Sequence, residues 1–250
     1  MSDLITVQGV VLSSMPVGEY DRRIVLLTRE RGKIAAFAKG ARRLNSPFMA
    51  AAAPFVFGNF TLYEGRSSYN LNHAEILHQF VELSKMQPEV YYGYYFLELA
   101  DYFGREGSDE KDVMNLLFVA VRSLMNHEID PRLVRCAYEF RLITIEGMMP
   151  AIFEFSDTGE RPEKNDQLFF SMSEHRLYKS SSALIPGDSF RISYAALIAL
   201  QYIASVPLAK LCAFSVTPEL LKELESIIYT YTAKNTDRRF KTLEILNMMI

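Results

Sequence analysis

The sequence has no tryptophan, only two cysteines and only four histidines in 250 residues. So few cysteines exclude a disulfide-stapled scaffold, and we expect Cys136 and Cys212, both in apolar helical patterns, to be buried reduced thiols. No histidine belongs to a zinc-protease motif, a nucleophile elbow or a familiar metal spacing. A glycine-rich phosphate-binding loop is also missing, which argues against ATP use. The sequence therefore predicts a binding protein, not an enzyme, with no cofactor and no metal.

Long apolar runs are missing as well. No stretch approaches the ~18 apolar residues that a membrane span needs. The first six residues lack the basic and apolar regions of a signal peptide. We expect a cytoplasmic protein that does not contact the membrane.

Charge is present but unevenly distributed. The formal net charge is −3, yet residues 1–50 carry eight Lys and Arg against four Asp and Glu. The remaining 200 residues carry 19 basic and 26 acidic side chains. A basic N-terminal region attached to an acidic body indicates a local site for a polyanion.

The first 80 residues predict short strands separated by turns. Residues 5–12, 23–28, 33–39, 55–64 and 68–75 are alternating or short apolar runs bounded by turn residues. We expect Met15 to Gly18 to break the first strand, and Gly32 to allow a tight turn after the second. Five such strands suit a small closed barrel of the OB type, although a five-stranded half-sandwich fits the pattern almost as well.

Beyond residue 80, apolar residues recur at helical spacing. Helices are predicted at residues 89–106, 110–126, 131–146, 194–205, 218–233 and 237–249. Pro131 suits a first helical position, and Gly147 suits a helix end. Residues 150–189 lack sustained periodicity and predict a loop-rich insert with a small hairpin. The predicted fold class is α+β, with an OB-fold barrel at residues 1–80 followed by a mostly α-helical domain at residues 81–250.

A tyrosine-rich segment runs from Tyr91 to Phe96. Aromatic side chains can stack on nucleic-acid bases. At helical spacing, however, Tyr92, Tyr95 and Phe96 share one face, so we expect them to pack in the core of the helical domain.

The basic residues of the N-terminal region gather at the predicted turns. They are Arg22, Arg23, Arg29, Arg31, Lys33, Lys39, Arg42 and Arg43. Basic side chains on the turns of a small barrel can follow a phosphate backbone, and glycines at positions 32 and 40 allow close approach. No base-reading pattern stands out, so we expect binding with little sequence preference. Ordinary exposed charge is the alternative interpretation.

Four segments between residues 7 and 43 form a more specific pattern. In order and spacing they resemble the N-terminal signature of the RecO family. The segments are Gly9-Val10-Val11-Leu12, Gly18-Glu19-Tyr20-Asp21, the run from Leu27 to Lys33, and the run from Ala38 to Arg43. Weaker similarity continues at residues 95–99, 140–150 and 237–243, so the resemblance covers nearly the whole chain.

The resemblance implies an N-terminal OB fold, a helical C-terminal domain and a nucleoid-associated mediator of recombinational DNA repair. Members of the family bind single- and double-stranded DNA and anneal complementary strands. With RecR they help to load RecA onto DNA coated by the single-strand-binding protein SSB. Some bind the acidic, hydrophobic C-terminal tail of SSB through their helical domain.

A second hypothesis is a protein–protein adaptor. In this case the helical domain recruits SSB and RecR, and DNA binding is secondary. An acidic peptide tail would need a basic rim around an apolar groove. The candidate rim residues flank the apolar helices of the middle region: Arg122, Arg132, Arg135 and Arg141.

The insert departs from the family in one respect. Many members carry a four-cysteine zinc site there, whose first pair falls at Phe155 and Thr158 of this chain, and no cysteine occurs between residues 137 and 211. A structural zinc site needs about four nitrogen or sulfur ligands. We therefore predict an insert without zinc, held by apolar packing. The candidates for that packing are Phe153, Phe155, Leu168, Phe169, Phe170, Leu177 and Tyr178.

Overall fold

A computed structural model describes residues 4–65 and 68–249. The first three residues, part of the N-terminus predicted to lack a signal peptide, lie outside this description. The chain forms two compact units. One contains the residues up to Asn126 together with those from Phe240 onward, and the other is His127–Arg239. The first two long helices thus cluster with the N-terminal strands, while the proposed domain boundary at residue 80 stays a prediction.

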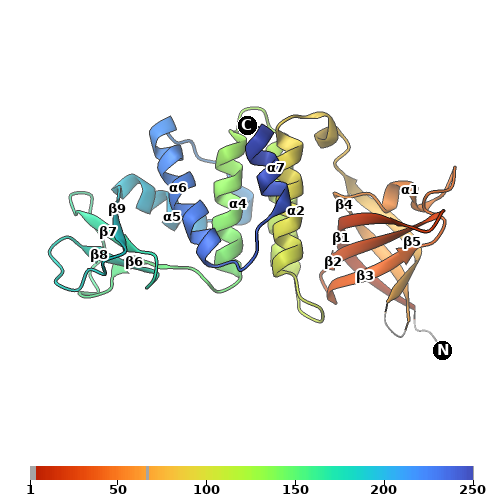
Figure 1. The fold of residues 1–250 in the computed structure, drawn as a ribbon, viewed down its shortest axis with the longest axis horizontal. Coiled ribbons are helices and arrows are strands. Elements are labelled where there is room, and N and C mark those ends of the chain that lie inside the picture. Colours follow the sequence, from red (N-terminus) through yellow and green to blue (C-terminus); the bar gives the residue numbers. More distant parts are fainter. Residues whose placement is uncertain (1–3, 66–67, 250) are drawn as a thin grey trace. The chain divides into compact units, whose positions relative to one another are not determined.

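Five strands of the first unit close into a barrel in the order β1-β2-β3-β5-β4 (Figure 1). They are β1 (Leu4–Val17), β2 (Asp21–Thr28), β3 (Gly32–Ala38), β4 (Val56–Glu64) and β5 (Tyr69–Gln79). All neighbouring strands are antiparallel except β3 and β5, whose short parallel contact closes the ring at Ala36–Tyr69 and Phe37–Asn70. An N-terminal OB fold in an α+β protein, as predicted, is confirmed.

Alternation along the strands fills the barrel, because successive side chains of a strand point to opposite faces. In β3, buried and half-buried residues alternate along the whole strand. Ile34 and Ala36 point inward and join Ile24 and Leu26 of β2 in the core. The intervening residues of β2 and β3, Arg23 among them, therefore lie on the outer face.

Strand β1 is longer than predicted. The expected break at Met15 to Gly18 is wrong, since β1 continues to Val17. Pro16 fits because this part of β1 pairs only with β2, while the first half pairs with β4, so no second neighbour needs its missing N–H. A bulge between Val11 and Ser13 bends the strand. The chain turns at Gly18, whose φ is 56°.

Helices complete the first unit. They are α1 (Phe48–Ala51), the 3-10 turn η1 (Glu82–Lys85), α2 (Glu89–Phe103), α3 (Lys111–Leu124) and α7 (Lys241–Met249). The side chains of Tyr92, Tyr95 and Phe96 in α2 are buried, which confirms the prediction that they pack in a core.

The last helix of the chain, α7, packs on α2. Glu98 Oε2 accepts a hydrogen bond from the Thr242 backbone N–H at 2.9 Å, so it caps the start of α7. The Phe240 ring lies 5.9 Å from the Tyr95 ring and 5.4 Å from the Tyr102 ring, measured between centroids. A segment distant in sequence therefore completes the first unit.

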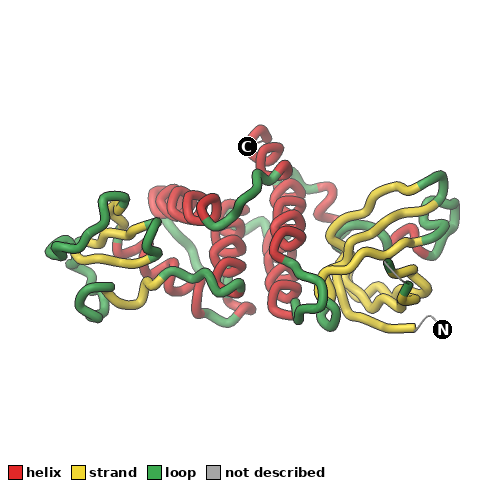
Figure 2. Tube along the Cα trace, turned by 60° about the horizontal axis from the view of Figure 1, so that its bottom comes forward, coloured by secondary structure: helices red, strands yellow, loops and turns green. Residues whose placement is uncertain are grey.

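The second unit combines helices with a small sheet. Its elements are α4 (Pro131–Ile145), β6 (Ala151–Phe155), β7 (Leu168–Ser171), β8 (Arg176–Lys179), β9 (Ser189–Ile192), α5 (Tyr194–Ser205), the 3-10 turn η2 (Leu208–Lys210) and α6 (Pro218–Lys234). The four strands form one sheet in the order β6-β8-β7-β9, drawn in yellow in Figure 2. The sequence predicted only a hairpin here, because strands of four or five residues are too short for a periodic signal.

Apolar packing holds this insert. Of the candidates, Phe155, Leu168, Phe170, Leu177 and Tyr178 are buried, as predicted. Phe169 is half-buried, and Phe153 is exposed, so the prediction is wrong for Phe153. Over residues 4–65 and 68–249 no group of three or more His, Cys, Asp or Glu side chains is placed to hold a metal ion.

Two further sequence expectations concern the thiols and the membrane. Cys136 is buried, and burial raises the pKa of its thiol, whereas Cys212 is only half-buried. None of the helices in the described part of the chain is both long enough and apolar enough to cross a membrane.

Candidate nucleic-acid interface

The eight basic residues predicted to bind DNA do not form one cluster. They are divided between the two ends of the β2–β3 hairpin, since Arg22 pairs with Ala38 at one end and Thr28 pairs with Gly32 at the other. At about 3.3 Å per residue, the seven steps from Arg22 to Arg29 span roughly 23 Å. We call residues 18–22 and 39–47 the open loops, and residues 29–33 the docked turn.

The docked turn is fastened to the segment that joins α2 and α3. The Lys33 backbone N–H donates to the Arg105 carbonyl at 2.9 Å, and the Gly107 N–H donates to the Arg31 carbonyl at 2.9 Å. Gly32 has a φ of 65°, and a Cβ at this position would lie 1.9 Å from the Arg105 carbonyl oxygen. Only glycine satisfies both constraints, so this turn serves the packing of the first unit.

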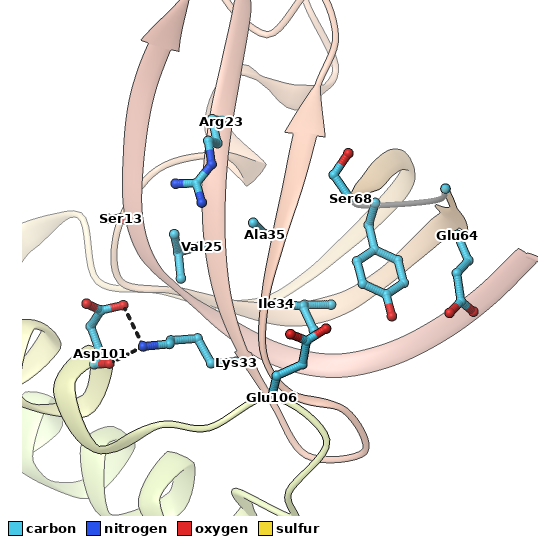
Figure 3. Close-up of a pocket in the computed structure, with 12 residues that line it drawn as sticks. Ser13, Arg23, Val25, Lys33, Ile34, Ala35, Glu64, Ser68, Asp101 and Glu106 are labelled. Carbon is cyan, nitrogen blue, oxygen red and sulfur yellow. Dashed lines mark hydrogen bonds and ion pairs between the residues drawn. The ribbon is translucent and has the colours of Figure 1, made fainter.

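Lys33 is also engaged by its side chain. Its Nζ donates to the Asp101 carbonyl and lies 3.6 Å from Asp101 Oδ1 (dashed lines in Figure 3). Arg29 and Arg31, in contrast, keep exposed side chains at the same turn. At the docked turn, Arg29 and Arg31 are therefore exposed to solvent, whereas Lys33 is paired with Asp101.

The open loops are fastened to each other. The Arg42 N–H donates to the Tyr20 carbonyl at 2.8 Å, and Arg42 Nη1 donates to the Gly18 carbonyl at 3.0 Å. The Arg43 guanidinium lies 4.9 Å from the centroid of the Tyr20 ring, over its face. Lys39, Arg42 and Arg43 are all exposed. These loops present an ordered basic surface with an aromatic ring in it.

A concave pocket of about 700 Å³ lies on the outer face of β2 and β3. Arg23 stands in it next to Val25 and Ala35, and the β4–β5 connection contributes Ser68 to its wall (Figure 3). Among the residues that the structure describes, the Arg23 guanidinium has no hydrogen-bond or ion-pair partner. OB folds bind oligonucleotides with this face and with the β1–β2 and β4–β5 loops. Arg22, on the inner side of the same strand, instead donates to Ser14 Oγ at 3.1 Å.

The opposite side of the pocket is acidic. Glu64, Asp101 and Glu106 line it, and we call these three residues the acidic wall. Burial, and next the charge of Glu64, raises the pKa of the Tyr69 hydroxyl beside them. A phosphate is favoured at the open loops and at Arg23 but repelled at the acidic wall. No sequence pattern predicted this wall, because Glu64 is distant in sequence from Asp101 and Glu106.

The four candidate partner-binding arginines have different surroundings. Arg135 is buried and its Nε donates to Glu139 Oε1 at 2.6 Å, while Arg141 donates to the Ala204 and Val206 carbonyls at the C-terminal end of α5. Arg132 pairs with Asp130, the N-cap of α4, at 2.6 Å, and holds the pKa of that carboxyl below its usual range. Arg122, in the first unit, is exposed. Three of the four thus hold contacts within the second unit.

Comparisons with known proteins cover both parts of the chain. The family described as "Recombination protein O N terminal" matches residues 1–80, and "Recombination protein O C terminal" matches residues 88–244. The chain is 29% identical to the DNA repair protein RecO of Alkaliphilus metalliredigens over 97% of this chain and 98% of that protein. It is 26% identical to that of Clostridium novyi and 23% identical to that of Clostridium kluyveri, each over 97% of this chain and 93% of the relative.

Proposed function

The chain belongs to the RecO family of recombination and DNA-repair proteins, and on that premise we propose that the open end of its barrel binds DNA. The observation that carries the proposal is the juxtaposition of Arg42, Arg43 and Tyr20 in the open loops. Lys39 and Arg23 extend this basic surface toward the face that OB folds use for oligonucleotides.

The proposed mechanism is electrostatic. Lys and Arg side chains neutralise backbone phosphates and release condensed counterions, so the affinity falls steeply with salt. Because no base-specific arrangement is present in the open loops, the site would accept single and double strands of any sequence. Two strands held side by side on a basic surface repel each other less, which would favour annealing. We infer that the chain acts by binding and not by covalent catalysis.

The partners proposed from the family are RecR, the C-terminal tail of SSB and, indirectly, RecA, at the nucleoid in the cytoplasm. In this proposal the protein and RecR help to load RecA onto SSB-coated DNA. For the SSB tail, Arg122 and Arg132 remain the accessible candidates, because Arg135 and Arg141 are committed to internal contacts.

A salt series tests the DNA proposal. The affinity of the purified protein for single- and double-stranded oligonucleotides of matched length is measured by fluorescence anisotropy at rising salt. We expect log affinity to fall linearly with log salt, with a slope of about −0.7 per contacted phosphate for the single strand. Absence of binding at low salt would overturn the proposal.

A peptide titration separates the adaptor hypothesis. An acidic, apolar-ended peptide with the sequence of an SSB tail is added to the protein, and a peptide of the same composition in scrambled order is the control. Peptide binding without DNA binding would favour the adaptor, and DNA binding without peptide binding would remove the tail from the proposed partners.

A further inference from the structure

Leu44 is the most exposed of the large apolar residues in the open loops, with 87% of its surface accessible. It lies between Arg43 and Asn45 in a tight turn, in which the Ser46 N–H donates to the Arg43 carbonyl at 3.1 Å. Asn45 has a φ of 63°, the left-handed conformation that the third position of a type II turn requires. Leu44 therefore occupies the second position, where the backbone directs it outward.

The backbone on both sides of Leu44 is held in place. Ala41 is buried in the barrel core, and the Gly40 N–H donates to Asp21 Oδ1 at 2.7 Å. Arg42 donates to two carbonyls of the facing loop, as described above. These contacts order the turn on which Leu44 is exposed.

The charges around Leu44 limit what can cover it. Lys39, Arg42 and Arg43 are exposed cations of the same loop. The acidic groups of the facing loop are Glu19, which is exposed, and Asp21, whose Oδ1 accepts from Gly40. The positive excess selects a ligand that is anionic on its outside and apolar within. A nucleic-acid strand has this character, because its phosphates flank the flat apolar faces of its bases.

We propose that Leu44 inserts between neighbouring bases of a bound strand, while the stacked Tyr20 and Arg43 side chains pack against the base beside it. The inference rests on the proposed DNA binding and adds a contact to bases. Apolar wedges unstack base steps in this way, and aromatic and guanidinium planes stack on single bases. A strand opened at one step presents unstacked bases for pairing, which connects the turn to annealing.

The test compares wild type with Leu44→Ala, with the conservative Leu44→Met, and with Leu184→Ala, a control in the second unit whose leucine is 69% exposed. Each protein is titrated with oligothymidylate and with an abasic deoxyribose-phosphate chain of the same length. On oligothymidylate we expect Leu44→Ala to weaken binding about five- to tenfold, the size of a lost base contact. On the abasic chain it should bind like wild type, and the other two variants should behave like wild type on both ligands.

Each other outcome has a distinct meaning. Equal affinities of Leu44→Ala and wild type on oligothymidylate, or an equal loss on both ligands, would overturn the base contact and leave DNA binding intact. Failure of wild type to bind either ligand would overturn the proposed function itself. A loss confined to vesicles of phosphatidylglycerol and phosphatidylcholine, with DNA binding unchanged, would assign the turn to a lipid surface and also overturn the inference.

Discussion

The two ends of the β2–β3 hairpin carry the same kinds of residue but have different surroundings. At the docked turn, Gly32 and Lys33 contact the α2–α3 segment, and the acidic residue Glu106 follows closely in that segment. At the open loops, a Cβ at the corresponding glycine, Gly40, would meet only the Arg43 side chain within 4 Å, with its Cδ nearest at 3.6 Å. A count of Lys and Arg at turns is therefore not enough to locate a phosphate site. The groups that pack against each turn decide whether its basic side chains are available to a phosphate.

The largest effect that separates the two ends should be on stability. Gly32→Ala combines a strained φ with a backbone overlap, and we expect it to lower the free energy of unfolding by about 3–5 kcal/mol. Gly40→Ala shares the positive φ, but its nearest neighbour would lie 3.6 Å away, so about 1 kcal/mol is expected. Urea unfolding followed by circular dichroism measures both. Equal losses would mean that the docked turn is not held by the α2–α3 segment.

The next effect should be on DNA affinity. Arg42→Glu with Arg43→Glu removes two exposed cations from the open loops, and we expect single-strand affinity at low salt to fall roughly tenfold or more, with a salt slope shallower by about 1.4. The matched control, Arg29→Glu with Arg31→Glu, makes the same charge change at the docked turn and should have a much smaller effect. A larger loss in the control would mean that DNA binds at the docked turn and would contradict the proposed site at the open loops.

Neutralising part of the acidic wall should strengthen binding. With Glu64→Gln and Glu106→Gln, the pocket beside Arg23 loses two of its three carboxylates. We expect a gain of about threefold in single-strand affinity, comparable to one exposed ion-pair interaction. Anisotropy at low and high salt checks it, because the gain should shrink as screening increases. An unchanged affinity would show that DNA does not approach this side of the pocket.

The smallest effect is expected at Lys33. Its ammonium is half-exposed and paired with Asp101. Lys33→Met should therefore change single-strand affinity by less than about twofold and cost about 0.5 kcal/mol of stability. A tenfold loss of DNA affinity would contradict this and would indicate that Lys33 contacts the DNA.

Much of the fold could be predicted because it depends on local patterns. Alternation gave the five strands, and helical spacing together with Pro131 and its N-cap Asp130 gave α4 within one residue of its observed end. Two features could not be predicted from local patterns. The sheet of the second unit consists of strands too short for periodicity, and Pro16 suggested a break that the one-sided pairing of β1 removes.

The candidate site was predictable only as a set of charges. Sequence spacing identified the basic turns but could not show that a hairpin separates them. Nor could it show that Glu64, Asp101 and Glu106 line the same pocket as Arg23, since closure of the barrel and the end of α2 bring these positions to one pocket. The exposure of Leu44 also depends on tertiary structure, because only the burial of Ala41 and the pairing of the two open loops fix the turn that carries it.

The contact between α7 and α2 has a consequence for biosynthesis. A ribosome makes the barrel and α2 early, yet Phe240 and Thr242, which pack on α2, emerge only after the whole of the second unit. Until then the Glu98 carboxylate and the Tyr95 and Tyr102 rings lack this cover. The second unit is contiguous and is free to fold first, whereas the older part of the nascent chain is finished last. Translation that stops before Phe240 would leave all residues of the second unit in place but α2 without its contacts to Phe240 and Thr242.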